Sequence, residues 1–315
     1  MVTKTKHKKR SLGIYYTPEP VVQLIFTILN IWKEHEDSAT GRWSKRGHYP
    51  AVIDPACGEG IFLKKAIESG FTKPKMVWGV DIDHNAFDRW KDIRLLQMFN
   101  SKSKPELHFF CRNGLLPLDN SIRFRHKRGG LREFDAVVGN PPYGGIGVGE
   151  IDNDLENALL NYEIWKSAIE RNGNTNQTEL GLMGHKKKLK GSVRDRLKKF
   201  PIEVLFLDRF IQLAKEGGWI AIVVPDGILA NSNLEYVRKY VSEKAKVEAV
   251  ISLPRNTFKN VGTSAKTSVL FLKKQKVKPE DYPVFLASTE NLEKQNLDKI
   301  LNFYRKFYET GKTIV

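Results

Sequence analysis

Cysteine is scarce in this sequence, and its scarcity argues against two kinds of protein. The 315 residues include 2 cysteines, Cys57 and Cys111, which are too few for a disulfide framework. The 7 histidines do not combine with them in the spacing of a metal site. We therefore expect a protein of a reducing compartment, with no structural zinc and no other metal.

Long apolar runs are also lacking. Residues 1–10 are rich in lysine but are not followed by the apolar stretch of a signal peptide, and no run reaches the length of a membrane span. We expect a cytoplasmic protein with no membrane partner. The hydrophobic content of 41% is enough for one large core.

Acidic residues are too few to balance the basic ones. The chain has 52 Lys and Arg against 36 Asp and Glu, which gives a formal net charge of +16. This excess is larger than solubility requires and favours a polyanionic partner. Residues 1–12 carry a run of this charge and are predicted to form a flexible basic arm.

Short apolar runs alternate with helical patterns along the rest of the chain, which is typical of an α/β fold. The predicted strands are 51–54, 76–80, 107–111, 134–138, 219–224, 247–253 and 267–272. Thr17 is predicted to cap the first helix, 37–50 to form a loop, and Gly217-Gly218 to end a helix over 203–215. A last helix is predicted over 292–308.

One long segment, residues 144–200, breaks this alternation. It is rich in glycine and lysine, so it is either a lid over the site or along a nucleic-acid backbone, or a solvated basic insertion. The predicted organisation is a catalytic domain over 13–285 that contains this insertion, followed by a helical extension over 286–315.

A glycine turn between the first strand and the next helix suggests a ligand site. Residues 54–60 read Asp-Pro-Ala-Cys-Gly-Glu-Gly, and backbone amides at a helix start can meet a ligand closely where glycine has no Cβ. Asp81 ends the second strand, as a ribose-binding acid does. Asn113 follows the third strand and could bond an adenine edge or close an Asx turn.

The fourth strand delivers Asn140-Pro141-Pro142-Tyr143 to the same edge of the sheet. The Asn140 side-chain oxygen and the Pro141 carbonyl can accept two hydrogen bonds, while Tyr143 offers a flat face. That combination suits a planar amino group, although a lone Asn-Pro-Pro also serves as a polar turn. Phe258 follows the sixth strand and could pack on its own loop or form a second face for a base.

Together these segments resemble the gamma class of N6-adenine DNA methyltransferases. The resemblance covers residues 12–275 and is carried by Tyr16-Thr17-Pro18, the 54–60 turn, Val80-Asp81, the Asn140 tetrad and 258–272. It is nearest to type I restriction-modification methylase subunits and to the methylase part of fused restriction-modification enzymes. The family has a Rossmann-like, seven-stranded, mostly parallel sheet with helices on both faces, and uses S-adenosylmethionine.

The resemblance also assigns roles to residues. It implies a site-specific enzyme that methylates the N6 amino group of a flipped-out adenine. Asn140, Pro141, Pro142 and Tyr143 would be catalytic, and Tyr143 and Phe258 would stack on the base. The residues expected to bind the cofactor are Tyr16, Thr17, Pro18, Asp54, Pro55, Ala56, Cys57, Gly58, Gly60, Asp81, Ile82, Asn113 and Gly114.

Double-stranded DNA is the expected partner, together with a specificity subunit or a recognition domain in a longer protein. Two alternatives stay open at this point. The same tetrad would serve a methyltransferase that acts on RNA bases or on protein glutamine. The chain could also be a cofactor- and DNA-binding subunit that is inactive without its specificity partner.

Overall fold

The structure is a computed structural model of the chain, and it describes most of the predicted core. The described residues are 16–45, 48–92, 94–99, 108–117, 133–143, 148, 153–159, 162–165, 195, 198–259, 265–275 and 281–310. The predictions of a basic arm over 1–12 and of a lid over 144–200 concern residues that lie mostly outside these ranges.

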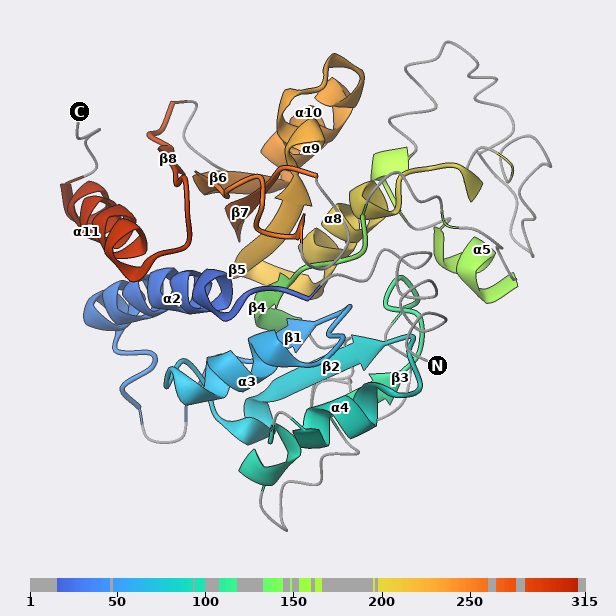
Figure 1. The fold of residues 1–315 in the computed structure, drawn as a ribbon, viewed down its shortest axis with the longest axis horizontal. Coiled ribbons are helices and arrows are strands. Elements are labelled where there is room, and N and C mark those ends of the chain that lie inside the picture. Colours follow the sequence, from blue (N-terminus) through green and yellow to red (C-terminus); the bar gives the residue numbers. More distant parts are fainter. Residues whose placement is uncertain are drawn as a thin grey trace.

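A single sheet organises the described residues (Figure 1). It has eight strands in the order β3-β2-β1-β4-β5-β7-β6-β8. Neighbours from β3 to β5 are parallel, β7 is antiparallel to β5 and β6, and β8 is parallel to β6. The strands are β1 (Val52–Asp54), β2 (Val77–Asp81), β3 (Phe109–Cys111), β4 (Phe134–Gly139), β5 (Ala214–Pro225), β6 (Ala245–Ser252), β7 (Thr267–Lys274) and β8 (Phe285–Ser288).

The chain order changes direction between β1 and β4. From β1 the sheet grows through β2 to β3, and the chain then returns to place β4 on the other side of β1. In an open α/β sheet such a switch leaves a crevice at the carboxyl ends of the strands, where ligands bind. The fold therefore puts the candidate site at the edge where β1 and β4 end.

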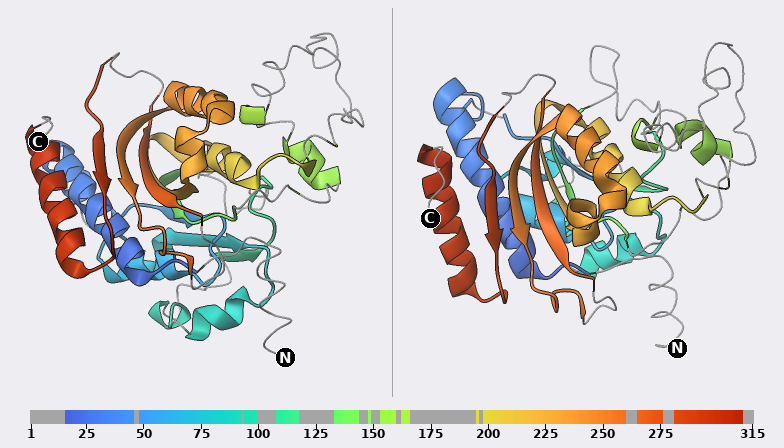
Figure 2. Two further views of the ribbon diagram at one scale, coloured as in Figure 1. Left: turned by 45° about the horizontal axis from the view of Figure 1, so that its top comes forward. Right: turned by 90° about the horizontal axis from the view of Figure 1, so that it is seen from above.

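Helices cover both faces of the sheet (Figure 2). One face packs against α2 (Glu19–Thr40), α3 (Ile61–Glu68), α4 (Ala86–Asp92) and α11 (Lys294–Thr310). The other packs against α5 (Asn153–Leu159), α8 (Ile202–Leu213), α9 (Asp226–Ala230) and α10 (Glu235–Lys244). Single 3-10 turns lie at Pro74–Met76, Leu96–Met98 and Ser232–Leu234. The predicted α/β class with helices on both faces is confirmed.

The expected count of seven strands is wrong by one in the described part of the chain. The additional strand, β8, has four residues that alternate between half-buried and exposed, and it pairs with β6 at the end of the sheet. So short an edge strand depends on its neighbour more than on its own sequence, so the apolar pattern did not reveal it. The last helix, α11, is confirmed; the proposed division at residue 286 stays a prediction.

Three predicted boundaries differ from the structure. Pro18 takes the N-cap position of α2, so Thr17 does not cap it, and α2 continues through residues 37–40 until Gly41, whose φ of 62° ends the helix. Gly217 and Gly218 do not end α8, which stops at Leu213. They lie inside β5, where the pairing with β4 is irregular.

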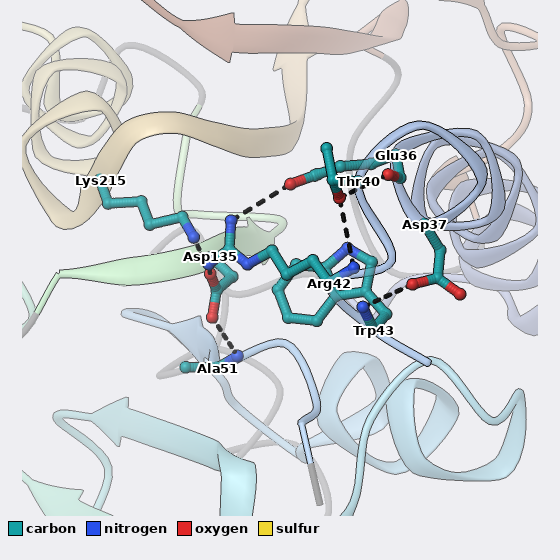
Figure 3. A network of polar contacts seen from close by, with 8 residues as sticks. All are labelled: Glu36, Asp37, Thr40, Arg42, Trp43, Ala51, Asp135 and Lys215. Carbon is teal, nitrogen blue, oxygen red and sulfur yellow. Dashed lines mark hydrogen bonds and ion pairs between the residues drawn. The ribbon is translucent and has the colours of Figure 1, made fainter. Parts of the chain in front are cut away.

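Asp135 ties the amino ends of three strands to the end of α2, at the edge opposite the candidate site (Figure 3). Its carboxylate accepts hydrogen bonds from the Ala51 amide and from Arg42, each at 2.8 Å, and pairs with Lys215. The Arg42 guanidinium also lies 4.2 Å from the centre of the Trp43 ring. One carboxylate thus holds two cations and the start of β1.

We predict that Asp135→Ala lowers the free energy of unfolding by about 1–3 kcal/mol, because the Ala51 amide and Lys215 lose this acceptor and Arg42 is left with Glu36. Urea unfolding followed by circular dichroism measures this. The control is Asp88→Ala, which removes an exposed partner of Lys91 and is expected to change stability by less than about 0.5 kcal/mol. Equal losses in the two variants would contradict the role of Asp135.

Candidate active site

The structure brings the predicted segments together at the carboxyl edge of the sheet. Strands β1, β2, β3 and β4 are parallel neighbours, so the residues that follow each of them meet at this edge. The register aligns Asp54 with Gly79, and Asp81 with Cys111. The start of α2 joins them through a hydrogen bond of 3.0 Å between the Asn140 amide and the Thr17 hydroxyl.

The glycine turn after β1 needs its glycines. Gly58 and Gly60 have φ angles of 48° and 78°, in the left-handed region that side chains disfavour. A Cβ on Gly60 would also lie 2.6 Å from Leu95 and 2.8 Å from Trp90. Gly60 is the N-cap residue of α3, so the turn leads directly into the helix start, as predicted.

The glycine turn after β1 holds the side chain of Asp81, which was predicted to lie beside it. One of its carboxylate oxygens accepts the Gly58 amide at 2.6 Å, and the other accepts the Asp83 amide at 2.8 Å. Burial raises the pKa of Asp81, and these two N–H groups act against that rise. The carboxylate is thus oriented by main chain, with lone pairs left to accept further hydrogen bonds.

Trp90 is a functional residue that the sequence did not reveal. Its indole N–H donates to the Gly58 carbonyl at 2.9 Å, and its ring packs on Phe109 with centroids 4.4 Å apart. Trp90 therefore fixes the turn from the α4 side. Its only sequence signal is an aromatic residue in the helix after Asp81, which is equally typical of a core residue.

The loop after β3 packs directly on the turn after β1. A Cβ on Gly114 would lie 1.8 Å from the Pro55 carbonyl oxygen, so only glycine permits this approach. The Asn113 side-chain oxygen accepts the Leu115 amide at 3.0 Å. The Asx turn therefore forms, and whether Asn113 also contacts an adenine stays a prediction.

Buried side chains of other segments hold this loop by its carbonyls. Arg209 of α8 donates to the carbonyl oxygens of Gly114 and Leu116, at 3.1 and 2.7 Å. The Tyr162 hydroxyl donates to the Leu115 carbonyl at 2.7 Å. Both side chains are almost fully buried, and no local sequence pattern predicts either contact. Tyr162 belongs to the 144–200 insertion, so this part of the insertion supports the site.

Asn140 presents an unused acceptor. Its side-chain N–H donates to the Thr17 hydroxyl, while its side-chain oxygen is buried and has no hydrogen-bond partner among the described residues. A buried polar atom without a partner is rare and costs stability, and such an atom is often found where a ligand completes the site. The amide oxygen is the atom predicted to accept a substrate hydrogen.

Tyr143 and Phe258 lie together, as two faces of a base site would. Both are fully buried, with ring centroids 6.2 Å apart and planes at 82°. This edge-to-face contact leaves no parallel gap between the rings, so a base can lie between them only if a ring moves. Their stacking role stays a prediction.

Two predicted cofactor residues expose large apolar surfaces at the rim of the site. Tyr16 is 46% exposed and Ile82 is 54% exposed, whereas most large apolar side chains of the described residues are buried. Asp54 is fully buried, and burial raises its pKa well above the usual range. The edge thus combines apolar rim, glycine turn and carboxylates, which suits a ligand with both a ring and a polar tail.

Comparison with known proteins gives the family. The sequence matches the N-6 DNA Methylase family over residues 1–310. The chain belongs to this family. The resemblance to N6-adenine DNA methyltransferases that the motifs indicated is therefore confirmed.

Individual relatives are consistent with the family. The chain is 23% identical over 279 residues to a type I restriction enzyme EcoEI methylase subunit from Escherichia coli. The match covers 83% of this chain and 42% of that subunit, so the chain spans less than half the length of this relative.

Solved structures support the fold class. A type I restriction-modification methyltransferase subunit from Streptococcus thermophilus superposes with a TM-score of 0.59 at 19% identity, covering 95% of this chain and 54% of that one. A structure from Listeria monocytogenes described as a class I S-adenosylmethionine-dependent methyltransferase gives 0.57 at 20% identity, covering 93% and 71%. The predicted Rossmann-like methyltransferase fold is confirmed.

Two features are absent from the described residues. These residues contain no group of three or more His, Cys, Asp or Glu side chains that could hold a metal ion. None of their helices is long and apolar enough to span a membrane.

We predict that Gly114→Ala weakens binding of S-adenosylmethionine by at least about tenfold, because the new Cβ forces the 113–116 loop away from the Pro55 carbonyl. Isothermal titration calorimetry measures the affinity. The control is Gly70→Ala at the far end of α3, which has a φ of 72° but no atom within 4 Å of the new Cβ. It is expected to lose stability and keep its affinity, and equal affinities for Gly114→Ala and wild type would refute the prediction.

Proposed function

We propose that this chain transfers a methyl group from S-adenosylmethionine to the N6 amino group of adenine in DNA. The observation that carries the proposal is the buried side-chain oxygen of Asn140, which has no hydrogen-bond partner in the described part of the chain and lies at the edge that also holds the glycine turn and Asp81. Membership of the N-6 DNA Methylase family supports the same reaction.

The residues at this edge fit S-adenosylmethionine. Asp81 offers carboxylate oxygens to ribose hydroxyls, and the 54–60 turn admits a close approach of the backbone at the start of α3. Exposed Tyr16 and Ile82 supply apolar surface. When bound, the cofactor supplies an electrophilic methyl group on a sulfonium.

The chain's own contribution is to bind and orient the amino group. The Asn140 oxygen and the Pro141 carbonyl accept its two hydrogens, which draws the nitrogen lone pair out of conjugation with the ring. These acceptors are fixed before the substrate arrives, so they provide alignment and electrostatic stabilisation.

An adenine has to leave the duplex to reach these acceptors. Unstacking the base costs a few kcal/mol. Stacking of the flipped base on an aromatic side chain stabilises it by about 1–3 kcal/mol and offsets much of that cost. Tyr143 and Phe258 are the rings proposed to do this, after their edge-to-face contact has opened. Discrimination between adenine and other planar amino groups then depends on the space that these rings leave.

The proposed partners are double-stranded DNA and a specificity subunit. The relative from Escherichia coli is named as a methylase subunit, and this chain spans less than half of it.

The positive charge that favours DNA as a partner is unevenly distributed. Acidic and basic residues are nearly equal in number in the described part of the chain. Almost all of the net charge of +16 therefore falls on other ranges, above all 1–15, 118–132 and 166–194.

We predict that Asn140→Ala abolishes methyl transfer to DNA while binding of S-adenosylmethionine persists, because the amino group loses an acceptor that the cofactor does not need. Incorporation of tritiated methyl groups measures transfer. Asn30→Ala is the matched control, since the Asn30 amide also donates one partly buried hydrogen bond, to the Ser69 carbonyl far from the site. Transfer that survives Asn140→Ala would refute the role of Asn140.

We also predict that replacing the four lysines at 186–188 and 190 by glutamine weakens DNA binding and makes it less sensitive to salt. The slope of log affinity against log salt concentration should fall by about 0.9 for each lost phosphate contact. Fluorescence anisotropy with labelled duplex measures the slope.

The control for this variant removes the same charge from α11. It replaces four basic residues of α11 by glutamine: Lys294, Lys299, Arg305 and Lys306. An equal fall of the slope in both variants would show that net charge alone, and not the 186–190 range, determines DNA affinity.

A further inference from the structure

Thr17 has a contact that its predicted cofactor role does not explain. Its side chain is 3% exposed and accepts the Asn140 side-chain N–H at 3.0 Å. Pro18 and not Thr17 occupies the N-cap position of α2, so the hydroxyl is not used to cap the helix. This bond joins the end of β4 to the start of α2, across 123 positions of sequence.

An asparagine amide has two unlike ends, and only one of them can serve the proposed reaction. The oxygen can accept a substrate N–H, whereas the nitrogen would face the same amino group with a second pair of donors. Rotation of the amide by about 180° exchanges the two ends with little change in shape. A partner that holds the side chain is therefore needed, so that the amide stays where the oxygen can meet the substrate. A hydroxyl can serve as this partner, since it accepts from an amide nitrogen.

We propose that Thr17 is a positioning residue that holds the side-chain amide of Asn140 in place. In the observed arrangement the hydroxyl accepts from the amide nitrogen, and the amide oxygen faces away from it. The buried oxygen has no hydrogen-bond partner among the described residues. The inference rests on the proposed function of Asn140. It assigns Thr17 a role in orienting the acceptor, in addition to any contact with the cofactor.

The position of Thr17 suits this role, because the first turn of α2, which directly follows it, is anchored to other parts of the fold. Glu19 in the first turn of α2 pairs with Lys65 of α3 at 2.8 Å, which holds the start of α2 beside the helix that follows the glycine turn. Val21 and Val22, also in the first turn, are fully buried. The hydroxyl is therefore held in place by packing that does not involve Asn140.

Thr17→Val tests the inference, since valine keeps the shape and removes the hydroxyl. The expected result is a fall of about 10- to 100-fold in the rate of methyl transfer in a single turnover at saturating S-adenosylmethionine. Thr17→Ser, which keeps the hydroxyl, should retain most of the rate. Thr72→Val is the matched control: Thr72 is a fully buried threonine whose hydroxyl donates to the Pro50 carbonyl, and its loss should leave transfer unchanged.

Nuclear magnetic resonance gives a second readout that does not depend on activity. The side-chain amide signal of Asn140 is identified by its absence from Asn140→Ala. Its exchange with water should be slow in wild type and Thr17→Ser, and at least about tenfold faster in Thr17→Val, which has lost the acceptor.

The two readouts separate the possible failures. Wild-type protein that methylates no DNA would refute the proposed function, and the amide signal would still test the contact. A Thr17→Val variant with wild-type transfer, or with a slow transfer but an unchanged Asn140 amide signal, would overturn the positioning role.

Discussion

The candidate site depends on one hydrogen bond, from the Gly58 amide to the Asp81 carboxylate. It joins the turn after β1 to the end of β2. Residues of two other segments also hold the turn. Trp90 binds the Gly58 carbonyl, and Gly114 lies against the Pro55 carbonyl. The loop after β3 thus packs on the turn after β1 at a distance that only glycine permits. A side chain added at these points would separate segments that a cofactor has to contact together.

The Asn140 oxygen adds a second constraint. It is buried without a hydrogen-bond partner among the described residues, and this lowers the stability of the folded chain. A buried acceptor without a partner costs about 1–3 kcal/mol, which stable proteins usually avoid. A site that accepts an amino group requires such an atom, already oriented, before its substrate arrives. The contact with Thr17 holds the Asn140 side chain in position. The neighbouring prolines explain why the backbone there is stiff.

The sequence predicted the parts of this site that are local. A glycine turn after a strand, an acid at the end of the next strand and the Asn140 tetrad are each read from a few consecutive residues. The contacts that hold them are not local: Trp90 lies 32 positions from Gly58, and Arg209 lies 95 from Gly114. Thr17 shows the same limit. Its neighbours in sequence predicted that it caps α2, whereas its hydroxyl accepts a hydrogen bond from Asn140, 123 positions away. Strand β8 was missed because its pairing depends on β6.

The central claim is that adenine in DNA supplies the amino group that meets Asn140. The most direct measurement incubates the chain with labelled S-adenosylmethionine and equal amounts of unmethylated DNA, RNA and protein, and identifies the methylated product by mass spectrometry. The account predicts label in N6-methyldeoxyadenosine. Label in ribonucleosides or in methylglutamine, in place of deoxyadenosine, would contradict it.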